Sequence, residues 1–132
     1  MIPKAESQYI EFKLESINAP ELAEEIVAFA NAEGGEIWLG IDDAGNIEGL
    51  SRSFEADVMN ICRNNCIPPI RPQYDEVRDS GQVVARITVP KGPDRPYYTS
   101  RHRYYIRVGT TKRIASREEL VRLFVNGERG AF

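Results

Sequence analysis

The sequence is poor in the residues that commonly hold small domains together through covalent or metal links. It contains two cysteines and one histidine. Cys62 and Cys66 lie four positions apart, and His102 is distant from both. Two thiols cannot build a disulfide framework, and one distant imidazole adds too few ligands for a structural zinc site. We therefore expect both cysteines to pack in the core of a protein from the reducing cytoplasm.

Long apolar segments and nucleotide-binding loops are also missing. No hydrophobic run approaches the roughly 18 residues that a transmembrane helix needs. The first residues, MIPKAE, contain no apolar segment of the signal-peptide type. These absences predict a protein without a membrane partner. The pattern G-x-x-x-x-G-K-[ST] occurs nowhere in the sequence, so no phosphate-binding loop supports ATP binding.

Charge is plentiful but unevenly distributed along the chain. There are 17 basic and 20 acidic residues, which give a net charge of −3. Residues 1–50 contain 2 basic and 11 acidic side chains, whereas residues 91–132 contain 10 basic and 4 acidic ones. The acidic overall balance argues against a general nucleic-acid binder, but the C-terminal third taken alone does not. Pairing of the two regions across the fold explains the same charges equally well.

The hydrophobic pattern predicts one α+β domain over residues 1–132, with a mixed sheet and about three helices. A chain of 132 residues is long enough for a single core. Apolar alternation and turn residues predict strands at 9–13, 37–41, 47–50, 72–78, 82–89, 97–99 and 103–109. Capping residues predict helices that begin after Asn18, Ser53 and Ser116.

The stretch 22–50 predicts the central unit of this fold. Leu22, Ile26 and Phe29 recur at three- and four-residue intervals, which is typical of a helix with one apolar face. A Gly-Gly pair at 34–35 ends that helix and leads directly into a buried strand. The turn at 42–46 then predicts a return strand at 47–50, so that helix, glycine turn and hairpin form one unit.

Three motifs occur in a fixed order along the chain. They are ESQYIEFK at Glu6–Lys13, AFANAEGGEIWLGIDD at Ala28–Asp43, and YYIRVGTTKRIA at Tyr104–Ala115. Together they resemble the Schlafen-type AlbA-like domain of predicted transcriptional regulators and vertebrate Schlafen proteins, which has also been called a divergent AAA, or ATP-binding, domain. The resemblance extends from Glu6 to about Leu123. It implies a DNA- or RNA-binding domain of a transcriptional regulator, with an ATP-binding module as one alternative.

The resemblance also implies a carboxylate site. Schlafen endoribonucleases carry a similar pattern, which here falls on Glu6, Glu11 and Asp43. Carboxylates from a first strand and a neighbouring strand end can converge on Mg²⁺ or Mn²⁺, and such an ion can activate water. The alternative function is therefore a metal-dependent endoribonuclease with these three residues as metal ligands and catalytic groups. The competing interpretation makes Asp43 a turn former and Glu6 a solvated residue.

Basic residues interleaved with aromatic ones form a second candidate site. Alternation along the strand at 103–109 predicts that Arg103, Tyr105 and Arg107 share one face, suited to phosphate contacts and base stacking. Given the resemblance, we expect nucleic acid to bind Lys13, Arg101, Arg103, Tyr105, Arg107, Lys112 and Arg113. The competing interpretation is a solvated sheet face whose arginines balance the acidic N-terminal half. Lys13, two residues beyond Glu11, is also the nearest counter-charge for the carboxylates.

The resemblance carries two expectations about assembly. Members of the family often continue into further domains, so residues 1–132 are expected to be the N-terminal part of a longer protein. In Schlafen proteins two copies of the domain form a clamp around RNA. Because this chain has one copy, we expect a homodimer with two-fold symmetry, the commonest closed arrangement.

Overall fold

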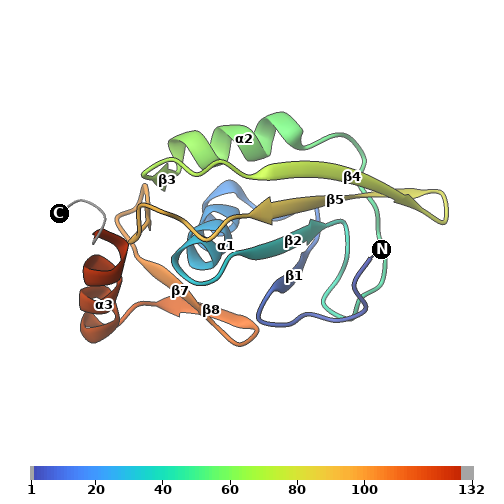
Figure 1. Cartoon of the computed structure of the whole chain (residues 1–132). Coiled ribbons are helices and arrows are strands. Elements are labelled where there is room, and N and C mark those ends of the chain that lie inside the picture. Colours follow the sequence, from blue (N-terminus) through green and yellow to red (C-terminus); the bar gives the residue numbers. More distant parts are fainter. Residues whose placement is uncertain (1, 129–132) are drawn as a thin grey trace.

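A four-stranded mixed sheet forms the framework of the domain. The computed structural model describes residues 2–128, and its largest sheet has the strand order β1-β2-β5-β4 (Figure 1). β1 is parallel to β2, and the other two neighbouring pairs are antiparallel. The strands are β1 (Ile10–Lys13), β2 (Gly35–Leu39), β4 (Gln73–Asp79) and β5 (Gln82–Val89). The predicted α+β class and mixed sheet are confirmed.

The main core lies between this sheet and two helices, α1 (Ala19–Asn31) and α2 (Glu55–Asn64). Asn18 caps α1 as expected, since its Oδ1 accepts a hydrogen bond from the backbone N–H of Glu21 at 2.8 Å. Leu22, Ile26 and Phe29 are buried on the sheet-facing side of α1. The opposite face of the sheet has a smaller apolar cluster around Trp38. α1 is thus held in a fixed position beside β1 and β2.

The glycine pair at the end of α1 permits a very close approach of three segments. Gly34 has a φ of +78°, and a Cβ there would lie 2.7 Å from the carbonyl oxygen of Val89. A Cβ at Gly35 would clash with the ring of Phe29. Only glycine fits both positions. The turn is therefore packed against β5 and α1, and it offers no open loop of the kind that binds ATP phosphates.

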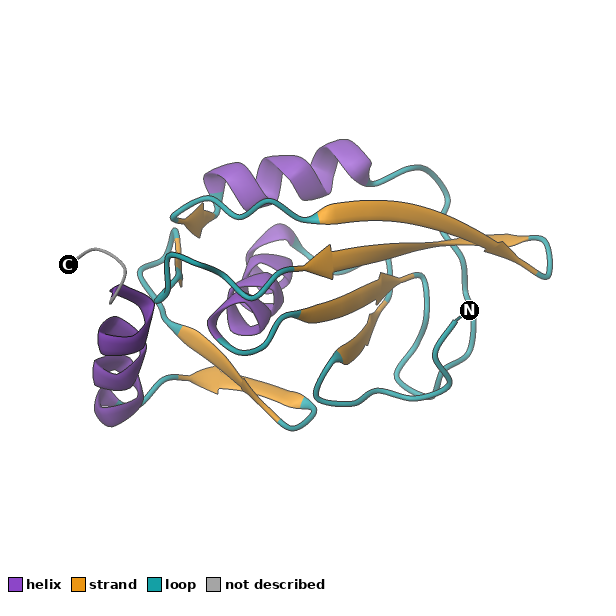
Figure 2. Cartoon of the chain, in the orientation of Figure 1, coloured by secondary structure: helices purple, strands orange, loops and turns teal. Residues whose placement is uncertain are grey.

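The C-terminal third adds a hairpin and a helix beside the main sheet. β7 (Tyr105–Val108) and β8 (Thr111–Ile114) form an antiparallel hairpin that contacts α1. β3 (Cys66–Ile67) pairs with β6 (Tyr98–Thr99) nearby. α3 (Arg117–Glu128) follows the hairpin and lies at one end of the molecule (Figure 2). None of the described helices is long and apolar enough to cross a bilayer.

Two expectations about local structure are wrong, and two are confirmed. Residues 47–50 do not form a return strand: Ile47 makes only an isolated bridge to Ile41, and β5 is the antiparallel neighbour of β2. β8 forms at Thr111–Ile114, where no strand was predicted. Ser116 does cap the helix that follows it, in a capping box with Glu119 whose two backbone-to-side-chain hydrogen bonds measure 3.2 and 2.8 Å. The two cysteines are free and buried, as predicted.

Candidate functional site

Arg107 of β7 fastens the C-terminal hairpin to the start of the chain. Its Nη1 donates to Oε1 of Glu11 at 2.9 Å, and its side chain is only 1% exposed. The guanidinium also donates to the carbonyl oxygens of Ser7 (2.7 Å), Gln8 (2.8 Å) and Ile10 (3.0 Å). Its carbon Cζ lies 4.3 Å from the ring centroid of Phe29 on α1. Arg107 thus joins β1, α1 and β7 at one buried point.

Glu25 of α1 completes a cluster of buried charges around this arginine. Its side chain is 3% exposed, and Oε2 lies 3.0 Å from Nζ of Lys112 and 3.4 Å from Nζ of Lys13. Lys13 in turn lies 3.6 Å from Glu11. The other oxygen, Oε1, accepts no hydrogen bond within the described residues, and the nearest cation is Arg107 at 3.9 Å. We call Glu11, Lys13, Glu25, Arg107 and Lys112 the buried charge cluster.

Burial and like charge change the protonation of this cluster. Burial is the main cause that raises the pKa of Glu11 to about 7, and the charge of Glu25 and the proximity of Glu6 add to it. The hydrogen bond from Arg107 acts in the opposite direction without reversing the shift. Burial by itself lowers the pKa of Lys13, but Glu25 and Glu11 more than offset it, so that pKa is raised.

Glu25 was not among the residues selected from the sequence. A signal was available, since Glu25 lies three positions after Leu22 and one before Ile26, and both of those face the core. An acidic residue at a core-facing helix position is rarely buried without a partner. Lys13 does contact Glu11, but the expectation that it is the nearest counter-charge is wrong, because Arg107 lies closer to Glu11, at 2.9 Å against 3.6 Å.

The three carboxylates expected to bind a metal lie in two different surroundings. Glu6 is half-buried next to Glu11, and its Oε2 accepts the backbone N–H of Phe12 at 3.0 Å. Asp43 is exposed and lines a separate pocket of about 250 Å³ together with Lys13 and Glu21. Within residues 2–128, no group of three or more His, Cys, Asp or Glu side chains is arranged to hold a metal ion. Because Glu11 is paired with Arg107 and Lys13, this arrangement does not fit Mg²⁺ or Mn²⁺.

The expected nucleic-acid face of β7 is divided between the interior and the surface. Tyr105 and Arg107 are buried, so the face that carries them is turned towards α1 and not towards solvent. The alternation itself was predicted, but the face that was expected to bind nucleic acid at the surface is the buried one. Lys112 belongs to the buried charge cluster. Arg101 and Arg103 are exposed, as binding would require.

Arg113 is exposed but already engaged. Its guanidinium makes a bidentate pair with Glu119, at 2.9 and 2.6 Å. This pair, together with the N–H of Ser116, lowers the pKa of Glu119 to about 2. Arg113 therefore stabilises the start of α3, and its charge is largely neutralised by that carboxylate.

Aromatic rings gather where the turn between β6 and β7 meets α3. The rings of Tyr98 and His102 have centroids 6.1 Å apart, and those of Tyr98 and Tyr104 are 5.0 Å apart. Phe124 of α3 extends the series, with its centroid 6.4 Å from that of Tyr104. We call these four rings the aromatic row. The sequence pattern pointed to Tyr105 as the stacking residue, but Tyr105 is buried, and its half-buried neighbour Tyr104 belongs to the row instead.

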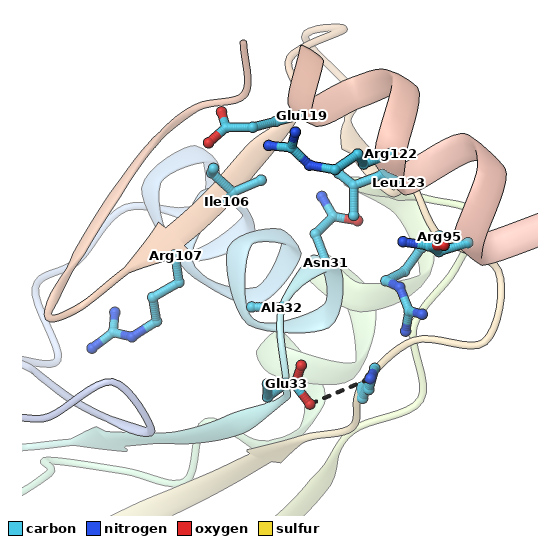
Figure 3. Close-up of a pocket in the computed structure, with 11 residues that line it drawn as sticks. Asn31, Ala32, Glu33, Arg95, Ile106, Arg107, Glu119, Arg122 and Leu123 are labelled. Carbon is cyan, nitrogen blue, oxygen red and sulfur yellow. Dashed lines mark ion pairs between the residues drawn. The ribbon is translucent and has the colours of Figure 1, made fainter. Parts of the chain in front are cut away.

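A cleft of about 320 Å³ is lined by α3, β7, the end of α1 and the loop 91–95 (Figure 3). Its cations come from Lys91, Arg95 and Arg122. Lys91 pairs with Glu33 at 3.3 Å. Arg107 also lines the cleft, but Figure 3 shows its guanidinium pointing away from it. Arg95 and Arg122 are thus the cations of this cleft without a carboxylate partner in the described chain.

The solved structures that resemble this chain include the following two. The crystal structure of the DIP2311 protein from Corynebacterium diphtheriae has 26% sequence identity and a TM-score of 0.74 over 89% of this chain. This chain spans only 27% of the length of that protein. The solution structure of the N-terminal domain of a RecG-related protein from Nitrosomonas europaea has 25% identity and a TM-score of 0.61, and the match covers 81% of this chain and 78% of that domain. No curated protein matches the sequence.

The family assignment comes from the sequence and agrees with these neighbours. The profile described as "Schlafen, AlbA_2" matches residues 6–116. That range begins at Glu6, includes the buried charge cluster and ends at the cap of α3. The structure places all three motifs of the sequence in one domain, with Arg107 of the third motif bonded to Glu11 of the first. The chain belongs to the Schlafen AlbA_2 family.

Proposed function

We propose that this domain binds nucleic acid through the end of the molecule formed by the β6–β7 turn and α3, as part of a transcriptional regulator. The observation that carries the proposal is that three arginines at this end are exposed and unpaired within the described residues. Arg101, Arg117 and Arg122 are exposed, and none of them forms an ion pair or side-chain hydrogen bond within residues 2–128. We call these three residues the open arginines. Unpaired guanidinium groups are the side chains best suited to phosphate oxygens.

The buried charge cluster explains why only part of the C-terminal positive charge is available. Arg107 and Lys112 are directed at Glu11 and Glu25, and Arg113 is directed at Glu119. These three cations therefore neutralise protein carboxylates and not phosphates. The arginines left over lie at the end of the molecule near α3, where the aromatic row also lies. Positive charge and exposed rings together are typical of nucleic-acid-binding surfaces.

The similar structures support a role with nucleic acid in general, without pointing to a particular surface. The RecG-related protein that contains one of the similar domains is named as an ATP-dependent DNA helicase of unconfirmed activity. A nucleic-acid-binding role at the N-terminus of such a protein is consistent with the role proposed for this chain. ATP binding has no comparable support, because the glycine turn is closed by its packing.

A salt titration tests the proposal. Binding of a fluorescently labelled oligonucleotide should weaken as salt rises, because phosphate contacts release condensed cations. Replacing Arg101 and Arg122 together by glutamate should make the plot of log affinity against log salt less steep by about 2, roughly one for each lost phosphate contact. The matched control is Arg78→Glu, an exposed arginine near the β4–β5 turn at the opposite end of the molecule (Figure 1). An equal salt slope in the double variant and the wild type would contradict the proposal.

The proposed assembly is a homodimer with two-fold symmetry in the cytoplasm. The cytoplasmic part is supported by the two free cysteines, and the dimer by the clamp formed by paired domains in Schlafen proteins. Light scattering at high protein concentration measures the mass directly. A monomeric mass there would refute the dimer without affecting the binding surface.

A further inference from the structure

The aromatic row has an exposed end on each side. Phe124 is 44% exposed, and His102 is exposed as well, whereas Tyr98 and Tyr104 between them are half-buried. Outward-facing ring surfaces are therefore available at both ends of the row. Arg101 and Arg103 flank His102 in the sequence and are themselves exposed. Cations next to exposed rings resemble the surfaces on which single strands stack their bases.

His102 is held outward by a strained turn. Its φ is +64°, a backbone conformation that residues other than glycine rarely adopt. The N–H of His102 donates to the carbonyl of Thr99 at 2.7 Å, and the N–H of Thr99 donates to the carbonyl of Arg103 at 2.9 Å. A glycine would fit this position without strain. Strained residues persist most often where a binding surface needs them.

We infer that the aromatic row is a stacking platform for unpaired bases, so that the ligand of this domain is single-stranded nucleic acid. The inference rests on the proposed function and specifies its substrate class. In a duplex the faces of the bases are covered by their neighbours, so the exposed rings of Phe124 and His102 have nothing to stack on. In a single strand the base faces are open, and the flanking arginines contact the phosphates between them.

A simpler role for the rings is to fasten α3 to the rest of the domain. The contact between Tyr104, the residue before β7, and Phe124 joins the β6–β7 turn to α3. That role requires Tyr104 and one side of Phe124, but it does not require His102. Substitutions at the two exposed ends, and not at Tyr104, therefore separate stacking from packing.

The test compares two labelled single strands of equal length, one with bases and one abasic, and a duplex of the same sequence. Wild-type protein should bind the base-bearing strand roughly a hundredfold more tightly than the abasic strand, since each of the two exposed rings stacks one base and each stacked base contributes about tenfold. The variants Phe124→Leu and His102→Gly should each lose most of that preference and leave the affinity for the abasic strand unchanged. His102→Gly suits the backbone, and circular dichroism checks that Phe124→Leu keeps α3.

Two control variants address nonspecific effects of the substitutions. Tyr9→Leu removes an aromatic ring that is 53% exposed and belongs to the N-terminal segment. Val125→Ala alters a side chain of α3 itself that is 65% exposed. Both should bind the three ligands as the wild type does. A loss of preference in either control would mean that the effect does not come from the aromatic row.

The outcomes distinguish this inference from the proposed function. Equal wild-type affinity for base-bearing and abasic strands, with a steep salt dependence, would overturn the stacking platform and leave the proposed function intact. Tighter binding of the duplex than of the single strand would also overturn it. No binding of any of the three ligands would remove the proposed function and this inference together.

Discussion

Arg107 and Glu11 meet at 2.9 Å in the interior of the domain, although 96 residues separate them in the sequence. The pair joins the first strand of the fold to the C-terminal hairpin that precedes α3. Because the same guanidinium also satisfies the backbone carbonyls of Ser7, Gln8 and Ile10, it fixes the position of the hairpin relative to β1 and the segment before it. The surface formed by the β6–β7 turn and α3 therefore depends on a contact that is itself inaccessible to any ligand.

Removing this arginine should destabilise the domain strongly. Arg107→Met leaves Glu11 and Glu25 in the interior with fewer cations and frees three backbone carbonyls, so we expect a loss of about 3–5 kcal/mol of unfolding free energy. Urea denaturation measures the loss. The matched control is Arg113→Met, which breaks an exposed pair with Glu119 and should change the unfolding midpoint little. A similar small change for Arg107→Met would show that the buried pair adds little to stability.

Local rules recovered most elements of this fold. The capping residues Asn18 and Ser116 correctly predicted where two helices begin. Apolar alternation correctly predicted the strands β1, β4, β5 and β7. The return strand at 47–50 was wrong, because Gly49 has a φ of +82° and the N–H of Leu50 bonds to Val83 of the neighbouring strand. The antiparallel partner of β2 is β5, and that pairing depends on long-range packing that no local pattern encodes.

The site was harder to predict because alternation does not say which face of a strand is inside. For β7 the sequence offered two arginines and a tyrosine on one face and Tyr104, Ile106 and Val108 on the other. The charged face is the buried one, since Glu11 and Glu25 provide partners from β1 and α1. The charge asymmetry of the chain was a real signal of this pairing. Which carboxylates pair with which cations became identifiable only in the three-dimensional structure.

The raised pKa of Glu11 predicts a pH dependence of stability. The carboxyl has a pKa of about 7 in the folded domain and about 4.5 when unfolded, so between these values the folded state binds the extra proton. Unfolding free energy should therefore fall as pH rises through this window, by up to about 3 kcal/mol for this group. Glu119, with its lowered pKa, loses its contribution only below this window. Urea unfolding at several pH values checks the slope, and Glu11→Gln should flatten it. A rise in stability across the window would contradict the assignment.

Glu25 should control the protonation of Glu11. Its charge is the second largest cause of the raised pKa of Glu11, so Glu25→Gln should move that pKa back towards its ordinary value. Carboxyl carbon chemical shifts followed by NMR during a pH titration would measure the change. Glu33→Gln, which removes an exposed carboxylate paired with Lys91, serves as the control. An unchanged pKa of Glu11 in the Glu25 variant would mean that burial and the neighbouring Glu6 cause the shift without a contribution from Glu25.

The nuclease alternative has a direct test. If the carboxylates keep the observed arrangement, a labelled RNA strand should be bound but not cleaved when Mn²⁺ or Mg²⁺ is added, because cations of the protein already pair with Glu11. Gel electrophoresis of the RNA after incubation reads out cleavage. Metal-dependent cleavage that is lost in Glu6→Gln and in Asp43→Asn would establish the endoribonuclease and show that these side chains rearrange on binding.

The most direct measurement is the affinity for a labelled single strand at fixed low salt, compared between the wild type and the variant with Arg101 and Arg122 both replaced by glutamate. Binding at the β6–β7 turn and α3 predicts that this variant binds at least roughly tenfold more weakly, whereas Arg78→Glu binds as the wild type does. Equal affinity of the wild type and the double variant, with both correctly folded, would contradict the assignment of this surface.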